Sequence, residues 1–188
     1  MKKIAYFICS LLVGVALTSC EKDEIGGTET EATAGQWYVT VDGADENGNV
    51  VEKFKDLYGL GRVLMLTTNT AANTPNEMIV TDLGNFWDFK VKVSCDQQGK
   101  TFQTNTSENN NLVEDYEDIN VSITGGKIIP QAGRQNNGSP ADSIVFYVTF
   151  SDDLTDVGGP TPVPTPQAYG FAKYKVSGIR YSGLVEND

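Results

Sequence analysis

The chain has 188 residues, with 14 basic and 25 acidic side chains and no histidine. Histidine titrates near neutral pH, is the usual base of serine and cysteine hydrolases, and is the commonest zinc ligand, so its absence excludes most familiar hydrolase and zinc-enzyme sites. The formal net charge of −11 excludes a typical nucleic-acid-binding protein, because that affinity comes mainly from basic side chains that neutralise phosphates.

Residues 1–19 have the pattern of an export signal peptide. Lys2 and Lys3 precede an apolar run over 4–16, which is shorter than the about 20 residues that a membrane-spanning helix needs. The run is followed by Leu-Thr-Ser-Cys at 17–20, which resembles a bacterial lipobox. This resemblance implies cleavage before Cys20 and acylation of Cys20, which then holds the protein on a membrane through acyl chains. The alternative is an ordinary secretory signal in which Cys20 has no role.

Residues 20–34 are predicted to form a flexible acidic tether, because they are rich in Gly, Thr and Glu and have little to bury. The acidic residues 21, 23 and 24 directly follow Cys20. This cluster resembles the signal that Bacteroidetes lipoproteins use to reach the cell surface. We therefore expect an outer-membrane lipoprotein exposed on the cell surface, with a plain solvated spacer and a periplasmic location as the alternative.

The cysteines argue against a disulfide framework. Of three cysteines, Cys9 leaves with the signal peptide and Cys20 is acylated, so Cys95 has no internal partner. Cys95 follows an apolar strand pattern and has no basic cluster beside it. We therefore expect a buried, unreactive thiol.

From residue 35 onward the sequence predicts strands separated by Gly, Asn, Asp and Pro clusters. Asn47-Gly48 and Gly84-Asn85 predict tight turns, and 112–119 contains at most two helical turns. Short strands without helical crossovers predict one all-β domain over 35–185, either an antiparallel sandwich or an antiparallel barrel. The predicted strands are 37–42, 50–54, 62–69, 77–82, 86–95, 100–104, 120–129, 143–150 and 169–181.

Apolar and polar residues alternate in several of these strands, as in a barrel wall with one dry and one wet face. The inward rows of a small barrel either fill its interior or line a pocket for one small apolar ligand, and the pattern leaves both open. The residues that we predict to line the barrel or bind a ligand are Trp87, Phe89, Val91, Phe146, Val148 and Tyr174.

The two ends of the domain resemble lipocalins. Gly35-Gln36-Trp37 opens the first strand and Arg180 lies near the end of the last. More specifically, residues 34–42, 78–93 and the closing segment 177–183 resemble a Bacteroidetes lipoprotein family labelled "lipid-binding putative hydrolase", and the resemblance covers most of 34–184. This resemblance implies an all-β fold, a single antiparallel lipocalin-like (calycin) β-barrel of about eight strands. In such a barrel, Trp37 and Arg180 form a structural cation-π pair that closes one end.

A hydrolase would need a nucleophile and a base, and the sequence offers few. No Gly-x-Ser-x-Gly motif occurs, and signal cleavage would sever the Ser-x-x-Lys motif from Ser19 to Lys22. Two sets of carboxylates remain for a carboxylate-based hydrolase, with turn capping and solvated charge as the structural alternatives. Two oxygen-rich stretches, 42–49 and 152–156, lack the full calcium-loop spacing, and we predict no metal site and no cofactor. The two carboxylate sets are Asp82 with Asp88, and Glu114, Asp115, Glu117 and Asp118.

The expected function is that of a membrane-anchored lipoprotein whose barrel binds a small apolar or amphipathic, lipid-like ligand. The alternative is a non-catalytic accessory module that displays loops to an outer-membrane protein partner. One such loop is the proline-rich stretch 158–167, which is predicted to be stiff and extended. A carboxylate-based hydrolase is a third and weaker hypothesis. An apolar cavity would indicate ligand binding, whereas a core packed to normal density would indicate the module.

Overall fold

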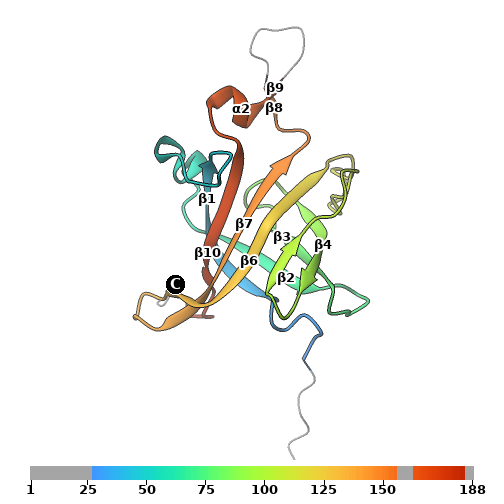
Figure 1. Ribbon diagram of the computed structural model, residues 1–188, viewed down its shortest axis with the longest axis vertical. Helices are drawn as coiled ribbons and strands as arrows, with labels where there is room; N and C mark the ends of the chain where they lie inside the picture. Colours follow the sequence, from blue (N-terminus) through green and yellow to red (C-terminus); the bar gives the residue numbers. More distant parts are fainter. Residues whose placement is uncertain (1–26, 156–162, 185–188) are drawn as a thin grey trace, which may run out of the picture.

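The computed structural model describes residues 27–155 and 163–184 (Figure 1). The predicted signal peptide 1–19, the predicted lipidation site Cys20 and the first part of the predicted tether lie outside the described residues. Within the described residues, no helix has the length and apolar character needed to cross a membrane.

Antiparallel strands close into one barrel of eight strands, which confirms the predicted all-β fold (Figure 1). Each barrel strand pairs with the next one along the chain, and the last pairs with the first, which is the up-and-down topology of lipocalin-like barrels. The strands are β1 (Gly35–Ala44), β2 (Val63–Asn69), β3 (Glu77–Thr81), β4 (Lys90–Asp96), β5 (Thr101–Gln103), β6 (Val121–Arg134), β7 (Pro140–Phe150) and β10 (Lys173–Arg180).

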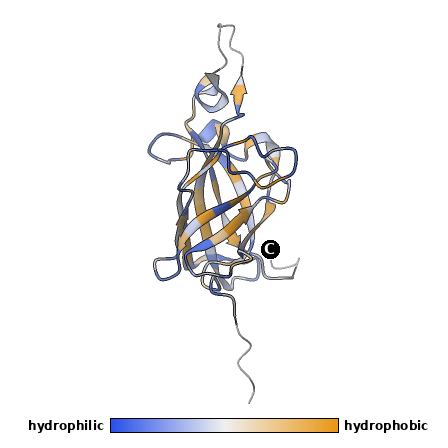
Figure 2. Cartoon of the chain, turned by 90° about the vertical axis from the view of Figure 1, so that its right-hand side faces the viewer, coloured by the Kyte–Doolittle hydropathy of each residue, from blue (hydrophilic) through white to orange (hydrophobic). Residues whose placement is uncertain are grey.

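The barrel interior is filled by the inward side chains of its strands. Figure 2 shows hydrophobic residues along the strands of the barrel body and hydrophilic residues in many of the connecting loops. Burial of these apolar side chains is the main force that holds the strands together, at about 25 cal/mol per Å² removed from water. The largest fully buried side chains are Trp37, Tyr174, Phe89, Phe146, Met65, Met78, Ile123, Ile128 and Ile144.

The predicted strand at 50–54 is wrong. The chain leaves β1 through a turn at Gly48 (φ 84°) and returns with a single bridge between Ala44 and Val50. It then forms two short 3₁₀ helices, η1 (Glu52–Phe54) and η2 (Leu57–Gly59). A reason for the break lies in Asp42, whose carboxylate accepts a 2.8 Å hydrogen bond from the backbone N–H of Asp56 and so bends the segment back over the barrel.

The predicted extended loop at 158–167 lies partly outside the described residues. From Val163 the chain forms β9 (Val163–Pro164), which pairs with β8 (Leu154–Thr155), and then the helix α2 (Thr165–Tyr169). Pro166 lies in the first turn of α2, where the missing N–H of proline is no loss. An extended conformation to residue 167 is therefore wrong for the part described.

The two ends of the barrel differ. Figure 1 places α2, β8 and β9 at the top of the barrel, and we call this the α2 end; η1, η2 and the β3–β4 loop also lie there. We call the opposite end, where Trp37 and Arg180 lie, the closed end. Residues 28–34, from the predicted tether, pack on the closed end: Thr30 and Thr33 are fully buried, and Thr67 donates a 2.7 Å hydrogen bond to the Thr33 carbonyl. The boundary between tether and domain stays a prediction.

Candidate functional site at the α2 end

The predicted barrel-lining residues fall into two groups. Phe89, Val91, Phe146, Val148 and Tyr174 are at most 1% exposed and belong to the hydrophobic core. They pack against one another inside the barrel, so in this structure they are core residues. Trp87 is different, because it is half-buried and lies at the α2 end, before the start of β4.

Trp87 belongs to a cluster of aromatic rings that covers the α2 end. Its indole stacks on Phe150, with ring centroids 4.7 Å apart and planes 8° apart, and its N–H donates a 3.1 Å hydrogen bond to Asp152. The ring of Tyr174 lies at the centre, 5.2 Å from Phe86 and 5.4 Å from Phe171. We call this cluster the aromatic plug: Phe54, Phe86, Trp87, Phe150, Phe171 and Tyr174.

Asp82 holds the loop that carries two rings of the plug. Its side chain is fully buried and accepts hydrogen bonds of 2.7–3.1 Å from five backbone N–H groups, at residues 84, 86, 87, 88 and 89. These bonds fix Phe86 and Trp87 over the barrel and delay β4 to Lys90, so the strand does not begin at residue 86 as predicted. Since these amides occupy both carboxylate oxygens, the geometry of Asp82 is that of a turn cap.

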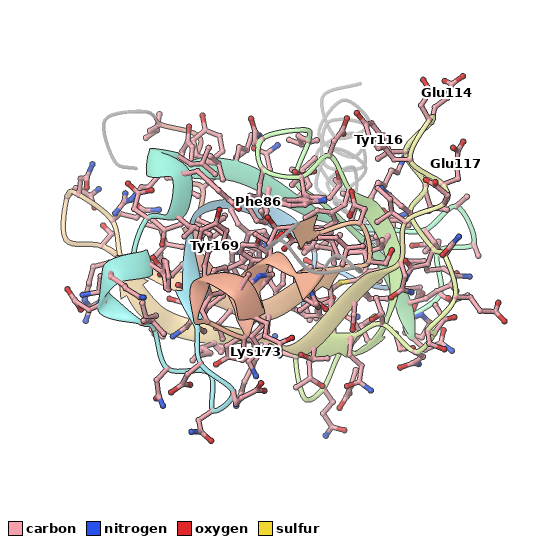
Figure 3. The ribbon with its side chains drawn as sticks, turned by 90° about the horizontal axis from the view of Figure 1, so that it is seen from above. Phe86, Glu114, Tyr116, Glu117, Tyr169 and Lys173 are labelled. Atoms are coloured by element: carbon pink, nitrogen blue, oxygen red, sulfur yellow. The ribbon has the colours of Figure 1, made fainter. Side chains whose placement is uncertain are left out.

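The second predicted carboxylate set lies away from the plug. Glu114, Asp115, Glu117 and Asp118 are exposed in the loop between β5 and β6. Figure 3 shows Glu114 and Glu117 at the edge of the α2 end, whereas Phe86 and Tyr169 lie nearer its centre. The structure therefore does not bring this set together with Asp82. Within the described part of the chain, no group of three or more acidic or cysteine side chains is placed to hold a metal ion.

A buried carboxylate links the barrel to the segment that carries α2. Asp153 is 5% exposed, and its Oδ2 accepts a 2.6 Å hydrogen bond from the Tyr174 hydroxyl. The backbone carbonyl of Asp153 accepts a 2.9 Å bond from the N–H of Thr165 at the start of α2. Burial, and then the bond to Asp153, raise the pKa of Tyr174 far above its ordinary value. Tyr174 is therefore a neutral donor that holds β8 and α2 against the barrel.

An apolar hollow of about 240 Å³ opens beside the plug, between the 3₁₀ helices and α2. Tyr58 and Tyr169, on opposite sides of it, are 62% and 59% exposed, so the hollow offers aromatic surface to solvent. Sequence reasoning missed it, because its two walls are about 110 residues apart in the chain. The lining residues are Phe54, Leu57, Tyr58, Thr165, Tyr169 and Phe171.

Three larger hollows are lined by other kinds of residue. One, of about 590 Å³, lies over β4, β5 and β6, and another, of about 530 Å³, lies at the closed end beside Lys100 and Arg180. The third, of about 340 Å³, lies beside β3 and β4 and is lined mainly by polar residues such as Glu77 and Lys92. Their linings are mainly polar side chains and glycines, whereas five of the six residues around the hollow at the α2 end are aromatic or aliphatic. That hollow is therefore the better candidate for an apolar ligand.

Cys95 lies away from the α2 end. Its thiol is half-buried, donates a 3.4 Å hydrogen bond to the carbonyl of Pro75, and accepts a 3.1 Å bond from the amide of Gln97. Burial raises the pKa of the Cys95 thiol, which lowers the fraction present as reactive thiolate.

At the closed end, the Arg180 guanidinium lies 4.5 Å from the centroid of the Trp37 ring. It also donates a 2.8 Å hydrogen bond to the carbonyl of Ala34 and pairs with Asp142 at 3.4 Å. The indole N–H of Trp37 donates to Thr67 at 2.9 Å. The contacts of the two predicted barrel-closing residues are thus with the protein itself.

A family model described as "Lipid-binding putative hydrolase" matches residues 22–185. No curated protein matches the chain. The family match and the eight-stranded barrel both support a role in lipid binding.

Proposed function

Because the chain belongs to the lipid-binding putative hydrolase family, we propose that it binds a lipid-like ligand in the hollow at the α2 end and not inside the barrel. The barrel interior is occupied by its own core, in which side chains such as Phe89, Phe146 and Tyr174 are fully buried. A ligand at the α2 end needs no rearrangement of that core.

The observation that carries this proposal is the solvent-exposed aromatic lining of the hollow. Its volume of about 240 Å³ is below the roughly 300–1,000 Å³ of pockets for drug-sized ligands. The hollow therefore suits one short acyl chain, or one segment of a longer chain, and not a whole diacyl lipid. Exposed Leu83 and Leu154, 48% and 52% exposed, provide further apolar surface near this end.

A variant with a polar residue in the hollow tests the proposal. Leu57→Ser in the hollow and Leu184→Ser, a matched control at a leucine that is 58% exposed outside it, are titrated with decanol. Losing the apolar contact of Leu57 costs about 1–2 kcal/mol, so we expect Leu57→Ser to weaken binding about tenfold and Leu184→Ser to change it less than twofold. Absence of decanol binding to the native chain, or equal effects of the two variants, would contradict the proposal.

We also propose that the protein is an outer-membrane lipoprotein attached through acylated Cys20, and more specifically that it is exposed on the cell surface. The lipobox-like sequence and the acidic residues after it support this location. Residues 28–34 pack on the closed end, so the described chain enters the domain at the end opposite the hollow. Metabolic labelling with an alkyne fatty acid should mark the native protein and not Cys20→Ser; protease treatment of intact cells should degrade it.

A second function, that of an accessory module with an outer-membrane protein partner, is favoured by the filled core and by the exposed Leu112 and Tyr116 in the β5–β6 loop, 55% and 43% exposed. A photo-crosslinking residue at position 116 distinguishes it. A single protein adduct in intact cells would support the accessory module. This second function makes no prediction about decanol binding.

A further inference from the structure

A lysine lies at the rim of the hollow. Lys53 is exposed in η1, and its Nζ lies 4.6 Å from the centroid of the Phe54 ring and 3.5 Å from the backbone carbonyl of Tyr169. Phe54 and Tyr169 both line the hollow, on opposite walls. The ammonium group is therefore held where an apolar chain inside the hollow would end.

Lys53 has no carboxylate partner among the described residues, because no Asp or Glu oxygen of that part of the chain lies within 4.0 Å of its Nζ. The neighbouring carboxylates are engaged elsewhere: Glu52 pairs with Lys55 at 2.7 Å, and Asp56 accepts a 2.7 Å hydrogen bond from the N–H of Gly61. An ammonium group has three donors. The long contact with the Tyr169 carbonyl uses one, so Lys53 can donate to a ligand.

The net charge of the chain, −11, does not prevent an anionic group from binding beside Lys53. At physiological ionic strength the Debye length is about 8 Å, so distant exposed carboxylates are largely screened and the nearest charge dominates. Glu114 and Glu117 lie at the edge of this end, away from Tyr169 (Figure 3). Lys53 is the cation held against the hollow, because its Nζ contacts two residues of the lining, Phe54 and Tyr169.

We infer that the ligand is a single-chain amphiphile with a carboxylate head, a medium-chain fatty acid, and that Lys53 binds the carboxylate while the chain occupies the hollow. This inference rests on the proposed lipid-binding function. One cation matches one carboxylate, and about 240 Å³ matches one short chain. A neutral lipid would leave Lys53 without an anionic partner, and a diacyl phospholipid would exceed the volume of the hollow.

A comparison of two ligands and two variants tests the inference. Decanoate, below its micelle concentration, and decanol have the same chain and differ in the head. Lys53→Gln removes the rim charge, and Lys55→Gln, a matched control two residues away, removes a lysine that is paired with Glu52. Binding of both ligands is measured by calorimetry at low and high salt.

We expect Lys53→Gln to weaken decanoate binding about three- to fivefold, as for an exposed ion pair, and to change decanol binding less than twofold. Lys55→Gln should change neither ligand, and high salt should weaken decanoate alone. Equal binding of decanoate and decanol to the native chain, or equal effects of the two variants, would overturn the inference and leave lipid binding standing. Failure of both ligands to bind would overturn the proposed function as well.

Discussion

Arg180 lies directly opposite Trp37 in the pairing of β1 with β10, and its guanidinium carbon is 4.5 Å from the centroid of the indole ring. The indole is fully buried and the guanidinium covers it, so one residue pair joins the first and last barrel strands and shields the core from water. A planar guanidinium suits this position because it stacks on the ring while its edge donates hydrogen bonds.

We predict that Arg180→Lys lowers the free energy of unfolding by about 1–2 kcal/mol, because a lysine keeps the charge and loses the stacking and the bond to Ala34. Urea unfolding followed by circular dichroism measures this. The exposed Arg134, in β6, gives the control Arg134→Lys, which should change the value by less than about 0.5 kcal/mol. Equal stability of the two variants would remove the special role of Arg180.

Removal of the Tyr174 hydroxyl should destabilise the α2 end. Tyr174→Phe leaves the buried carboxylate of Asp153 without its 2.6 Å donor, and we expect a loss of about 1–3 kcal/mol. Tyr116→Phe, in an exposed loop, is the control. Hydrogen exchange should show faster opening of β8 and α2 in Tyr174→Phe, and unchanged exchange there would contradict the link.

The same pair predicts a pH dependence. The pKa of Tyr174 is raised in the folded state, so the neutral phenol contributes stability below the ordinary tyrosine pKa of about 10, and this contribution is lost as pH rises above it. The native chain should therefore lose stability between pH 10 and pH 11 by about 1 kcal/mol more than Tyr174→Phe does. If the free energy of unfolding falls equally with pH in the native chain and in Tyr174→Phe over this range, the raised pKa of Tyr174 is contradicted.

Asp82→Asn should loosen the β3–β4 loop. The amide keeps one accepting oxygen and places an NH₂ group against backbone N–H donors, so we expect a loss of about 2–4 kcal/mol. Asp88→Asn is the control, because asparagine tolerates the left-handed conformation found there (φ 58°). The tryptophan emission maximum should shift to longer wavelength in Asp82→Asn, because the Trp87 indole becomes more exposed to water. An unshifted spectrum with native stability would show that the five bonds are dispensable.

The barrel could be predicted from the sequence because its signals are local. Alternation of apolar and polar residues, as from Phe89 to Val93, specifies which side chains enter the core, and turn residues separate the strands. The closed end could be predicted for another reason. The resemblance to lipocalins pairs Trp37 with Arg180, and the structure places the Arg180 guanidinium carbon 4.5 Å from the centroid of the Trp37 ring. Each of these features rests on short patterns or on a shared motif.

The α2 end could not be predicted in the same way. The alternation that begins at Phe86 looked like strand, but Asp82 binds the backbone of the intervening loop and turns Phe86 and Trp87 into the aromatic plug. Val50 pairs once and the chain then bends over the barrel, which no spacing in the sequence indicates. The hollow is lined by residues of η1, η2 and α2, distant segments that only the closed barrel brings together.

The position of the ligand can be read from tryptophan fluorescence, because the two tryptophans of the chain lie at opposite ends of the barrel. A fatty acid brominated near the end of its chain quenches the fluorescence of an indole close to it. We predict quenching in the native protein and its loss in Trp87→Phe, where Trp37 at the closed end is the remaining tryptophan. Quenching that persists in a folded Trp87→Phe would place the ligand near Trp37 or inside the barrel, and binding at the α2 end would then be wrong.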